Sequence, residues 1–110
     1  MGITKKELFS DQDNRIADYF KALGHPARVA IINHLMAVEG CCCNDLVEEI
    51  GLAQATISQH LKALKALDII QGSIEGKNLC YCINNKAWTE IQQILSEFVN
   101  HKLITNNTCC

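Results

Sequence analysis

Apolar residues recur at every third or fourth position over much of the chain, which is the spacing of amphipathic helices. Residues 11–23 form the first such helix, with Asp11 or Asp13 as its N-cap. Gly24 ends it, and Pro26 suits the first turn of a second helix that runs to about residue 38. The apolar stripes of the two helices consist of Ile16, Tyr19, Phe20 and Leu23, and of Val29, Ile31 or Ile32, Leu35 and Met36.

Two shorter helical segments follow, at about residues 44–50 and about residues 54–67, with Gly51 ending the first. The pattern then changes, because β-favouring residues at 69–74 and 77–83 flank Glu75-Gly76, which indicates a hairpin. Helical spacing returns from residue 85 to about residue 104. This order of elements predicts a mainly α-helical winged helix-turn-helix with one small β-hairpin.

The 110 residues fit one domain, residues 1–110, with residues 1–10 as an N-terminal extension and residues 105–110 as a tail that we expect to be mobile. No apolar run approaches the roughly 20 residues needed to span a bilayer. The first eight residues contain Lys5 and Lys6 but no hydrophobic stretch behind them, so they do not resemble a secretory signal. We therefore expect a cytoplasmic location, where thiols stay mostly reduced.

The fourth helical segment carries a polar face that suits DNA. The net charge of −2 is not typical of a nucleic-acid binder, so local charge must support this interpretation. The helix has no acidic residue between positions 54 and 67, and Gln, Ser and Thr near a helix start can reach base edges and phosphates. The candidate DNA-binding residues are Gln54, Thr56, Ser58, Gln59, His60, Lys62 and Lys65 on the helix, and Lys77 and Asn78 near the hairpin tip. The alternative is a solvated polar surface.

Large apolar residues at both ends of the chain predict a homodimer. A lone domain of this size has difficulty covering all of them, whereas two copies bury both stripes and provide the two-fold symmetry of a palindromic DNA site. The candidate interface residues are Tyr19, Phe20, Trp88, Ile91, Leu95, Phe98 and Val99. The alternative places these side chains in the core of one chain, and the two interpretations are compatible.

Seven cysteines are many for this length, and their odd number and placement favour reactive or metal-binding thiols over structural disulfides. The candidate ligands are Cys41, Cys42, Cys43, Cys80, Cys82, Cys109 and Cys110. Cys41 and Cys43 form a C-x-C pair at the entry to the third helix, where a helix N-terminus favours the thiolate form. Cys80 and Cys82 alternate with Tyr81 and therefore share one strand face. Cys42 is equally explained as a small buried hydrophobe.

Two stretches resemble the ArsR family of metal- and thiol-responsive repressors: residues 22–28 (ALGHPAR) and residues 52–62 (LAQATISQHLK). The hairpin at residues 72–83 is also similar, so the resemblance covers about residues 15–100. It implies a winged-helix homodimer joined through its first and last helices, with the fourth helix on a roughly palindromic operator. One departure is Ala53, which stands where the family usually has a helix-capping serine.

The resemblance also bears on the signal that the protein senses. Many arsenic, cadmium and lead sensors of the family carry a C-x-C at the place of Cys41 and Cys43, although Asn44 is inserted here relative to the commonest pattern. Soft thiolates select soft ions, and three of them suit arsenite or antimonite. The family's second metal site uses Asp and His pairs on the last helix; only His101 remains near its end here, so we expect that site to be absent.

Three other functions are alternatives to this interpretation. The closest rival keeps the repressor but makes the signal an oxidant or sulfide, sensed through a reversible disulfide or polysulfide. A thiol–disulfide enzyme is a second alternative, but this sequence lacks the βαβ pattern that usually surrounds the cysteine motifs of such enzymes. No Ser-His-Asp set, phosphate loop or catalytic carboxylate pair is visible either. A zinc-stabilised interaction module is the remaining option. We therefore expect a DNA-binding protein without enzymatic activity.

Overall fold

The structure is a computed structural model that describes residues 5–38, 41–75 and 78–103. A short 3-10 helix at Lys5–Leu8 precedes α1 (Asp11–Leu23) and α2 (Pro26–Ala37). The two-residue strand β1 (Cys41–Cys42) leads into α3 (Cys43–Ile50), which is followed by α4 (Gln54–Ala66). The strands β2 (Ile70–Glu75) and β3 (Asn78–Ile83) and the helix α5 (Asn85–Val99) complete the chain. The predicted order of helices and hairpin is confirmed.

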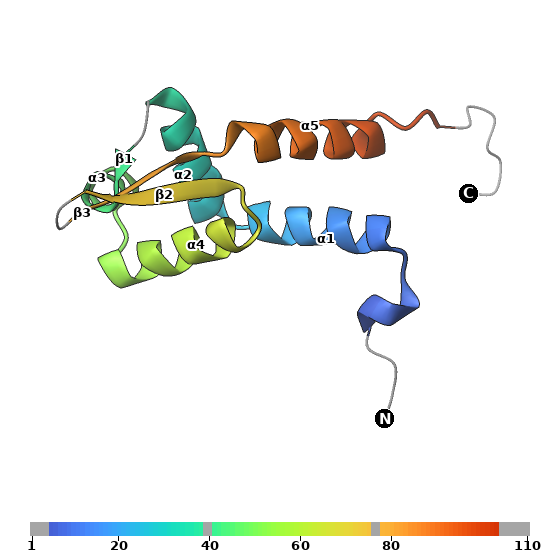
Figure 1. Cartoon of the computed structure of the whole chain (residues 1–110), viewed down its shortest axis with the longest axis horizontal. Helices are drawn as coiled ribbons and strands as arrows, with labels where there is room; N and C mark the ends of the chain where they lie inside the picture. The colour runs from blue at the N-terminus through green and yellow to red at the C-terminus, as the bar shows by residue number, and fades with distance from the viewer. Residues whose placement is uncertain (1–4, 39–40, 76–77, 104–110) are drawn as a thin grey trace.

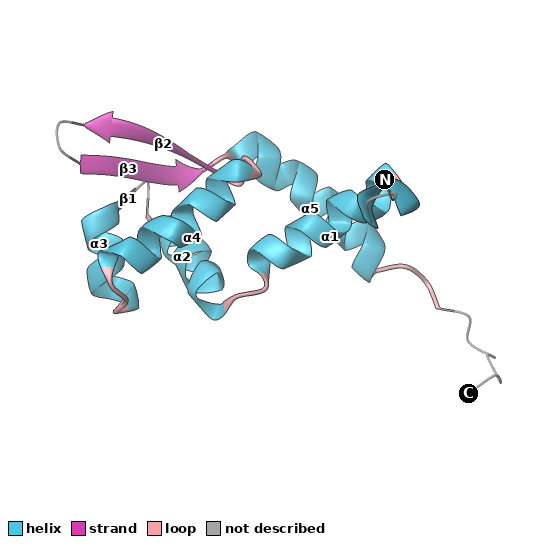
Figure 2. Ribbon diagram, turned by 90° about the horizontal axis from the view of Figure 1, so that it is seen from below, coloured by secondary structure: helices cyan, strands magenta, loops and turns pink. Residues whose placement is uncertain are grey.

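The molecule has two distinct ends (Figure 1). The helices α2, α3 and α4 gather against the hairpin at one end, while α1 and α5 extend together away from it, as Figure 2 shows from a second direction. The apolar faces of all five α-helices meet in one core. Its buried residues are Tyr19, Ala22, Ile31, Ile32, Leu35, Cys43, Leu46, Ile57, Leu61, Leu64, Ile69, Ile70 and Ile91.

Strand β3 is the middle strand of a three-stranded sheet, because β1 pairs with its other edge. Both pairings are antiparallel, with Cys42 opposite Cys80 and Gly72 opposite Tyr81. Gly72 leaves room for the Tyr81 ring, because a Cβ atom at position 72 would lie 2.7 Å from that ring and force it to move. The sequence places Cys41 at the entry to the third helix, and no pattern in it predicts that this segment joins the sheet.

The structure corrects several local expectations. The N-cap of α1 is Ser10, whose hydroxyl accepts a hydrogen bond from the Asp13 backbone N–H at 3.0 Å, and not Asp11 or Asp13. The last helix ends at Val99 and not near residue 104, and the Asn100 backbone N–H closes it on the Ser96 carbonyl.

The stripe expected for the second helix is also partly wrong. Val29 and Met36 are 46% and 50% exposed, whereas Ile31, Ile32 and Leu35 are buried. Because α2 carries apolar residues on nearly every side, its spacing alone did not define which of them face the core.

Candidate functional site

Helix α4 has one buried face and one polar, exposed face. Ile57, Leu61 and Leu64 are at most 1% exposed and hold the helix on the core. The outer face presents Gln54, Thr56, Ser58, Gln59, Lys62 and Lys65, all of them exposed. The predicted recognition residues of α4 therefore lie together on its solvent side, with His60 half-buried at their margin. An exposed helix face of this composition, without acidic residues, can enter a major groove.

A turn of three residues, 51–53, joins α3 to α4. Gly51 ends α3 with a φ of +82°, a left-handed conformation that glycine adopts without the strain of a side chain, and its backbone N–H bonds the Val47 carbonyl at 2.9 Å. Ala53 then occupies the N-cap position of α4 and provides no side-chain hydrogen bond. The first turn of α4 therefore keeps its backbone N–H groups available to an external acceptor such as a phosphate.

His60 is held by a contact that local sequence patterns do not predict. The Arg28 Nε donates to His60 Nδ1 at 3.1 Å, and the rings of His25 and His60 lie 4.5 Å apart. Desolvation lowers the pKa of His60, and repulsion from His25 and Arg28 adds to this effect. Since Nδ1 is an acceptor, the neutral ring carries its proton on Nε2. Nε2 is thus the nitrogen of His60 that can donate a hydrogen bond to DNA.

Arg28 also donates through Nη1 to the Ala22 carbonyl at 3.4 Å, at the C-terminal end of α1. The guanidinium therefore connects α1, α2 and α4. Sequence analysis noted Arg28 only as part of a resembling stretch, because its partner His60 lies 32 positions away. The other predicted DNA contacts are at the hairpin: Asn78 begins β3 opposite Glu75, and Lys77 lies outside the described residues.

The predicted interface residues divide into two groups. Tyr19 and Ile91 are buried within the single chain, at 7% and 1% exposure, and Trp88 and Leu95 are half-buried. Three side chains remain exposed, namely Phe20 at 42%, Phe98 at 55% and Val99 at 67%.

The exposed aromatic rings belong to the paired helices α1 and α5. The rings of Phe20 and Phe98 meet edge to face with centroids 5.8 Å apart. Arg15 of α1 joins the two helices through an ion pair, with its Nη2 3.4 Å from Oε2 of Glu90 on α5. Its Nε also donates a hydrogen bond to the Tyr19 hydroxyl at 3.1 Å, and this bond raises the pKa of Arg15. The result is an ordered helical pair that still exposes apolar surface to solvent.

The cysteines occupy different environments. Cys43 begins α3 and is buried, with its sulfur 3.9 Å from the Ser58 hydroxyl of α4. Cys41 and Cys42 form β1, paired with Tyr81 and Cys80 of β3. Cys80 and Cys82 are half-buried. Cys109 and Cys110 lie outside the described residues.

No group of three or more His, Cys, Asp or Glu side chains suited to a metal ion occurs among those that the structure describes. The side chains of Cys41 and Cys42 lie outside the described part of the structure. His101 is exposed and follows the end of α5. Within the described segments, no helix is long and apolar enough to cross a membrane.

Comparison with known proteins defines the family. The sequence model of the bacterial regulatory proteins of the arsR family matches residues 25–71, from the N-cap of α2 to the start of β2. The chain is similar to the uncharacterized HTH-type transcriptional regulator MJ1325 of Methanocaldococcus jannaschii, with 32% identity over 76% of this chain and 93% of the relative. A second relative is the cadmium resistance transcriptional regulatory protein CadC homolog of Staphylococcus aureus, 32% identical over 89% of this chain and 78% of the relative.

Among solved structures, the fold is similar to that of an ArsR-like transcriptional regulator from Rhodococcus sp. RHA1. The TM-score is 0.69 at 19% identity, over 83% of this chain and 85% of the other. The predicted resemblance and the winged-helix fold are both confirmed by these matches. The chain belongs to the ArsR family of bacterial regulatory proteins, and it is a DNA-binding transcriptional regulator and not an enzyme.

Proposed function

We propose that this regulator is a cytoplasmic repressor that binds operator DNA as a homodimer and is released when cysteine thiolates bind a soft ion of the arsenite or antimonite type. The observation that carries the DNA-binding part is the exposed face of α4, which presents Gln, Thr, Ser and Lys side chains without an acidic residue. The inducer part rests on the cysteines at the entry to α3 and on β3, because thiolates prefer soft ions.

The exposed rings of Phe20 and Phe98 and the side chain of Val99 favour a second copy of this chain as the partner of α1 and α5. An open apolar groove of about 380 Å³ continues this surface along α5, lined by Leu95 and Val99 among others. Pairing two copies there removes this surface from water and relates the two α4 helices by a two-fold axis. Such a dimer matches a palindromic operator.

The inducer is the part with a close rival. The name of the Staphylococcus aureus relative connects that protein with cadmium resistance, which favours a soft metal or metalloid here. The rival signal is an oxidant or sulfide, which would join two cysteines in a reversible disulfide or polysulfide. Both signals use thiols, so DNA release must be measured separately with each.

The first test is fluorescence anisotropy of the reduced, anaerobic protein on a labelled duplex from upstream of its own gene. Arsenite, zinc and a disulfide-forming oxidant are titrated in parallel. Release by near-stoichiometric arsenite alone supports the proposal, and release by the oxidant alone replaces the metalloid with a redox signal. Absence of binding to the duplex would refute the repressor interpretation.

The DNA-binding face has its own test. Gln59→Ala is expected to weaken binding to the preferred sequence by about 1–3 kcal/mol if Gln59 reads a base. Lys62→Ala should weaken binding to all sequences and reduce the slope of log affinity against log salt by about 1. Gln93→Ala, an exposed glutamine on α5, is the matched control. Equal affinities for all three variants would contradict the role of α4.

A further inference from the structure

Strand β3 places two cysteines on one face of the sheet and a third beside them. Cys80 and Cys82 are separated by one residue and therefore lie on the same face. Cys42 of β1 is the register partner of Cys80. Directly paired residues of antiparallel strands share a face, so all three cysteines hold positions on one side of the sheet. The opposite face contains Tyr81 and Ile83, which pack against the core.

The spacing of these three positions suits one bound ion. Cβ atoms of directly paired residues such as Cys42 and Cys80 lie about 4.5–5.5 Å apart. Cys80 and Cys82 are separated by about 6.7 Å along the strand, and the diagonal positions Cys42 and Cys82 by about 7–8 Å. Thiolate sulfurs bind a metal at about 2.3 Å, so two sulfurs on one ion are at most about 4.6 Å apart. Cysteine side chains that turn toward a common centre can close these separations.

We propose that Cys42, Cys80 and Cys82 form the binding site for trivalent arsenic. This inference rests on the proposed function and names the residues that bind the inducer. Arsenite, as As(OH)3, exchanges its three hydroxyl groups for three cysteine sulfurs. Three As–O bonds are replaced by three As–S bonds, each thiol proton leaves with a hydroxyl group as water, and neither arsenic nor sulfur changes oxidation state. The site joins the strand before α3 to the middle strand of the sheet.

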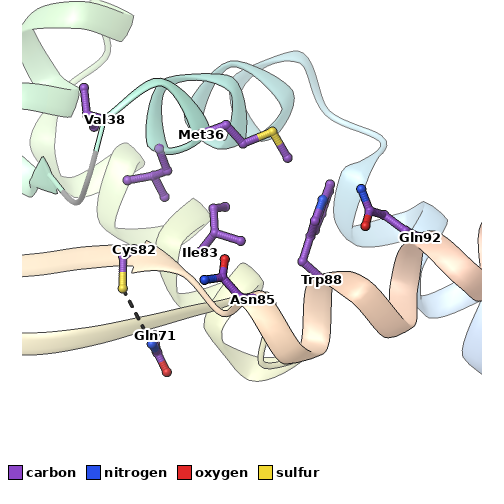
Figure 3. A pocket seen from close by; sticks show the side chains of 9 residues that line it. Met36, Val38, Gln71, Cys82, Ile83, Asn85, Trp88 and Gln92 are labelled. Carbon is purple, nitrogen blue, oxygen red and sulfur yellow. Dashed lines mark hydrogen bonds between the residues drawn. The ribbon is translucent and has the colours of Figure 1, made fainter.

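Cys82 gives this site an entrance. It lines an open cavity of about 590 Å³ between the C-terminal end of α2 and the start of α5, together with exposed Met36 and half-buried Trp88 (Figure 3). The Cys82 sulfur accepts a hydrogen bond from Gln71 Nε2 at 3.7 Å on the β2 side of β3, so it must turn toward β1 to share an ion with Cys42. A small neutral species such as As(OH)3 can therefore reach Cys82 from solvent.

Cys43 is excluded from the site by its surroundings. Its side chain is 7% exposed, belongs to the core and lies against Ser58 of α4. Cys41 is paired with Tyr81, at the register of the opposite sheet face. The C-x-C pair Cys41 and Cys43, which sequence analysis favoured, is therefore replaced by Cys42 with the two cysteines of β3.

The position of the site explains how an ion can act on DNA binding. Cys42 directly precedes the first residue of α3, so an ion held with β3 constrains where α3 begins. Helix α3 precedes α4 by a turn of three residues, and β3 forms half of the hairpin. An ion that joins β1 to β3 therefore changes how α4 and the hairpin are placed relative to each other. Release from DNA requires such an ion to bind the DNA-free arrangement more tightly than the DNA-bound one.

The test measures arsenite binding directly, apart from DNA. Arsenite is titrated into the reduced, anaerobic full-length protein, and binding is followed by calorimetry and by protection of thiols from a colorimetric reagent. The expected wild-type result is one arsenite per chain with three thiols protected. Cys42→Ser, Cys80→Ser and Cys82→Ser should each weaken binding at least about tenfold, equivalent to about 1.4 kcal/mol. Cys41→Ser and Cys109→Ser are matched controls and should bind as the wild type does.

The outcomes separate this inference from the proposed function. Wild-type affinity in Cys42→Ser, Cys80→Ser or Cys82→Ser overturns the assignment. Loss of binding in Cys41→Ser, or absence of arsenite binding to the wild type, overturns it as well. Arsenite binding with the expected cysteine dependence but without DNA release upholds the site and refutes the inducer part of the function. Far-UV circular dichroism of each variant, with Cys80→Ala as a second substitution at the central position, distinguishes a lost ligand from a lost fold.

Discussion

The missing side-chain cap of α4 allows a quantitative prediction: Ala53→Ser should stabilise the protein. Ala53 has φ −60° and ψ 148° and makes no side-chain hydrogen bond to the first turn of α4. Ser10 has nearly the same backbone conformation, φ −66° and ψ 157°, and caps α1 through the Asp13 N–H at 3.0 Å. A serine hydroxyl at position 53 should therefore reach the corresponding N–H of Thr56. Since Ala53 is exposed, the added oxygen displaces no core atom.

The size of the effect follows from measured caps in other helices. Exchanging alanine for a capping serine changes stability by about 0.5–2 kcal/mol, typically about 1 kcal/mol. With a urea slope of about 2 kcal/mol/M for a domain of this size, the unfolding midpoint should rise by about 0.5 M. The fluorescence of Trp88, the single tryptophan, reports unfolding at a fixed protein concentration, because the stability of a dimer depends on concentration.

Ser10→Ala provides the reverse experiment and should lower the midpoint by a similar amount. The two caps are on different helices, so the double variant should return close to the wild-type midpoint. An unchanged midpoint for Ala53→Ser with an unchanged slope would refute the argument that an absent side-chain cap weakens α4. A changed slope would instead indicate an effect on the unfolded chain.

Two further predictions concern pH and assembly. Because the pKa of His60 is lowered in the fold, the unfolded chain binds more protons than the folded chain below about pH 6.5, so stability should fall as the pH falls from 7.5 to 5.5. His60→Gln should reduce this loss in urea denaturation, and an equal loss in both proteins would contradict the assignment. Phe98→Glu should convert the proposed dimer to a monomer in analytical ultracentrifugation, whereas Leu52→Glu, an exposed apolar position at the opposite end, should not. A dimeric Phe98→Glu protein would exclude the α1–α5 surface as the interface.

The DNA-binding half of this protein was largely predictable from local sequence. Helix α4 alternates buried and exposed positions with helical period, so the polar residues named from the sequence lie on its exposed side and Ile57, Leu61 and Leu64 lie in the core. Gly24, Pro26 and Gly51 marked helix ends because their backbone preferences are independent of distant residues. Such information is contained in a few consecutive residues, and the structure agrees with it.

Choices among neighbouring residues of similar chemistry depended on packing. Ser10, Asp11 and Asp13 are all competent N-caps, and only the path of the chain into α1 places the Ser10 oxygen at the third helical N–H. The selection of Ile31 over Val29 in α2 has the same origin. When a helix is apolar on most sides, the neighbours that cover it determine which residues become buried.

Contacts between distant segments were decided by the tertiary structure alone. A two-residue strand has no periodicity to detect, so the pairing of Cys42 with Cys80 follows from where α2 and the hairpin bring their chains together. The contact of Arg28 with His60 likewise joins residues on different helices. The sequence by itself determined the helices, the hairpin and an unusual supply of thiols; tertiary structure decided which thiols share a sheet face, because strand register is a property of the folded chain.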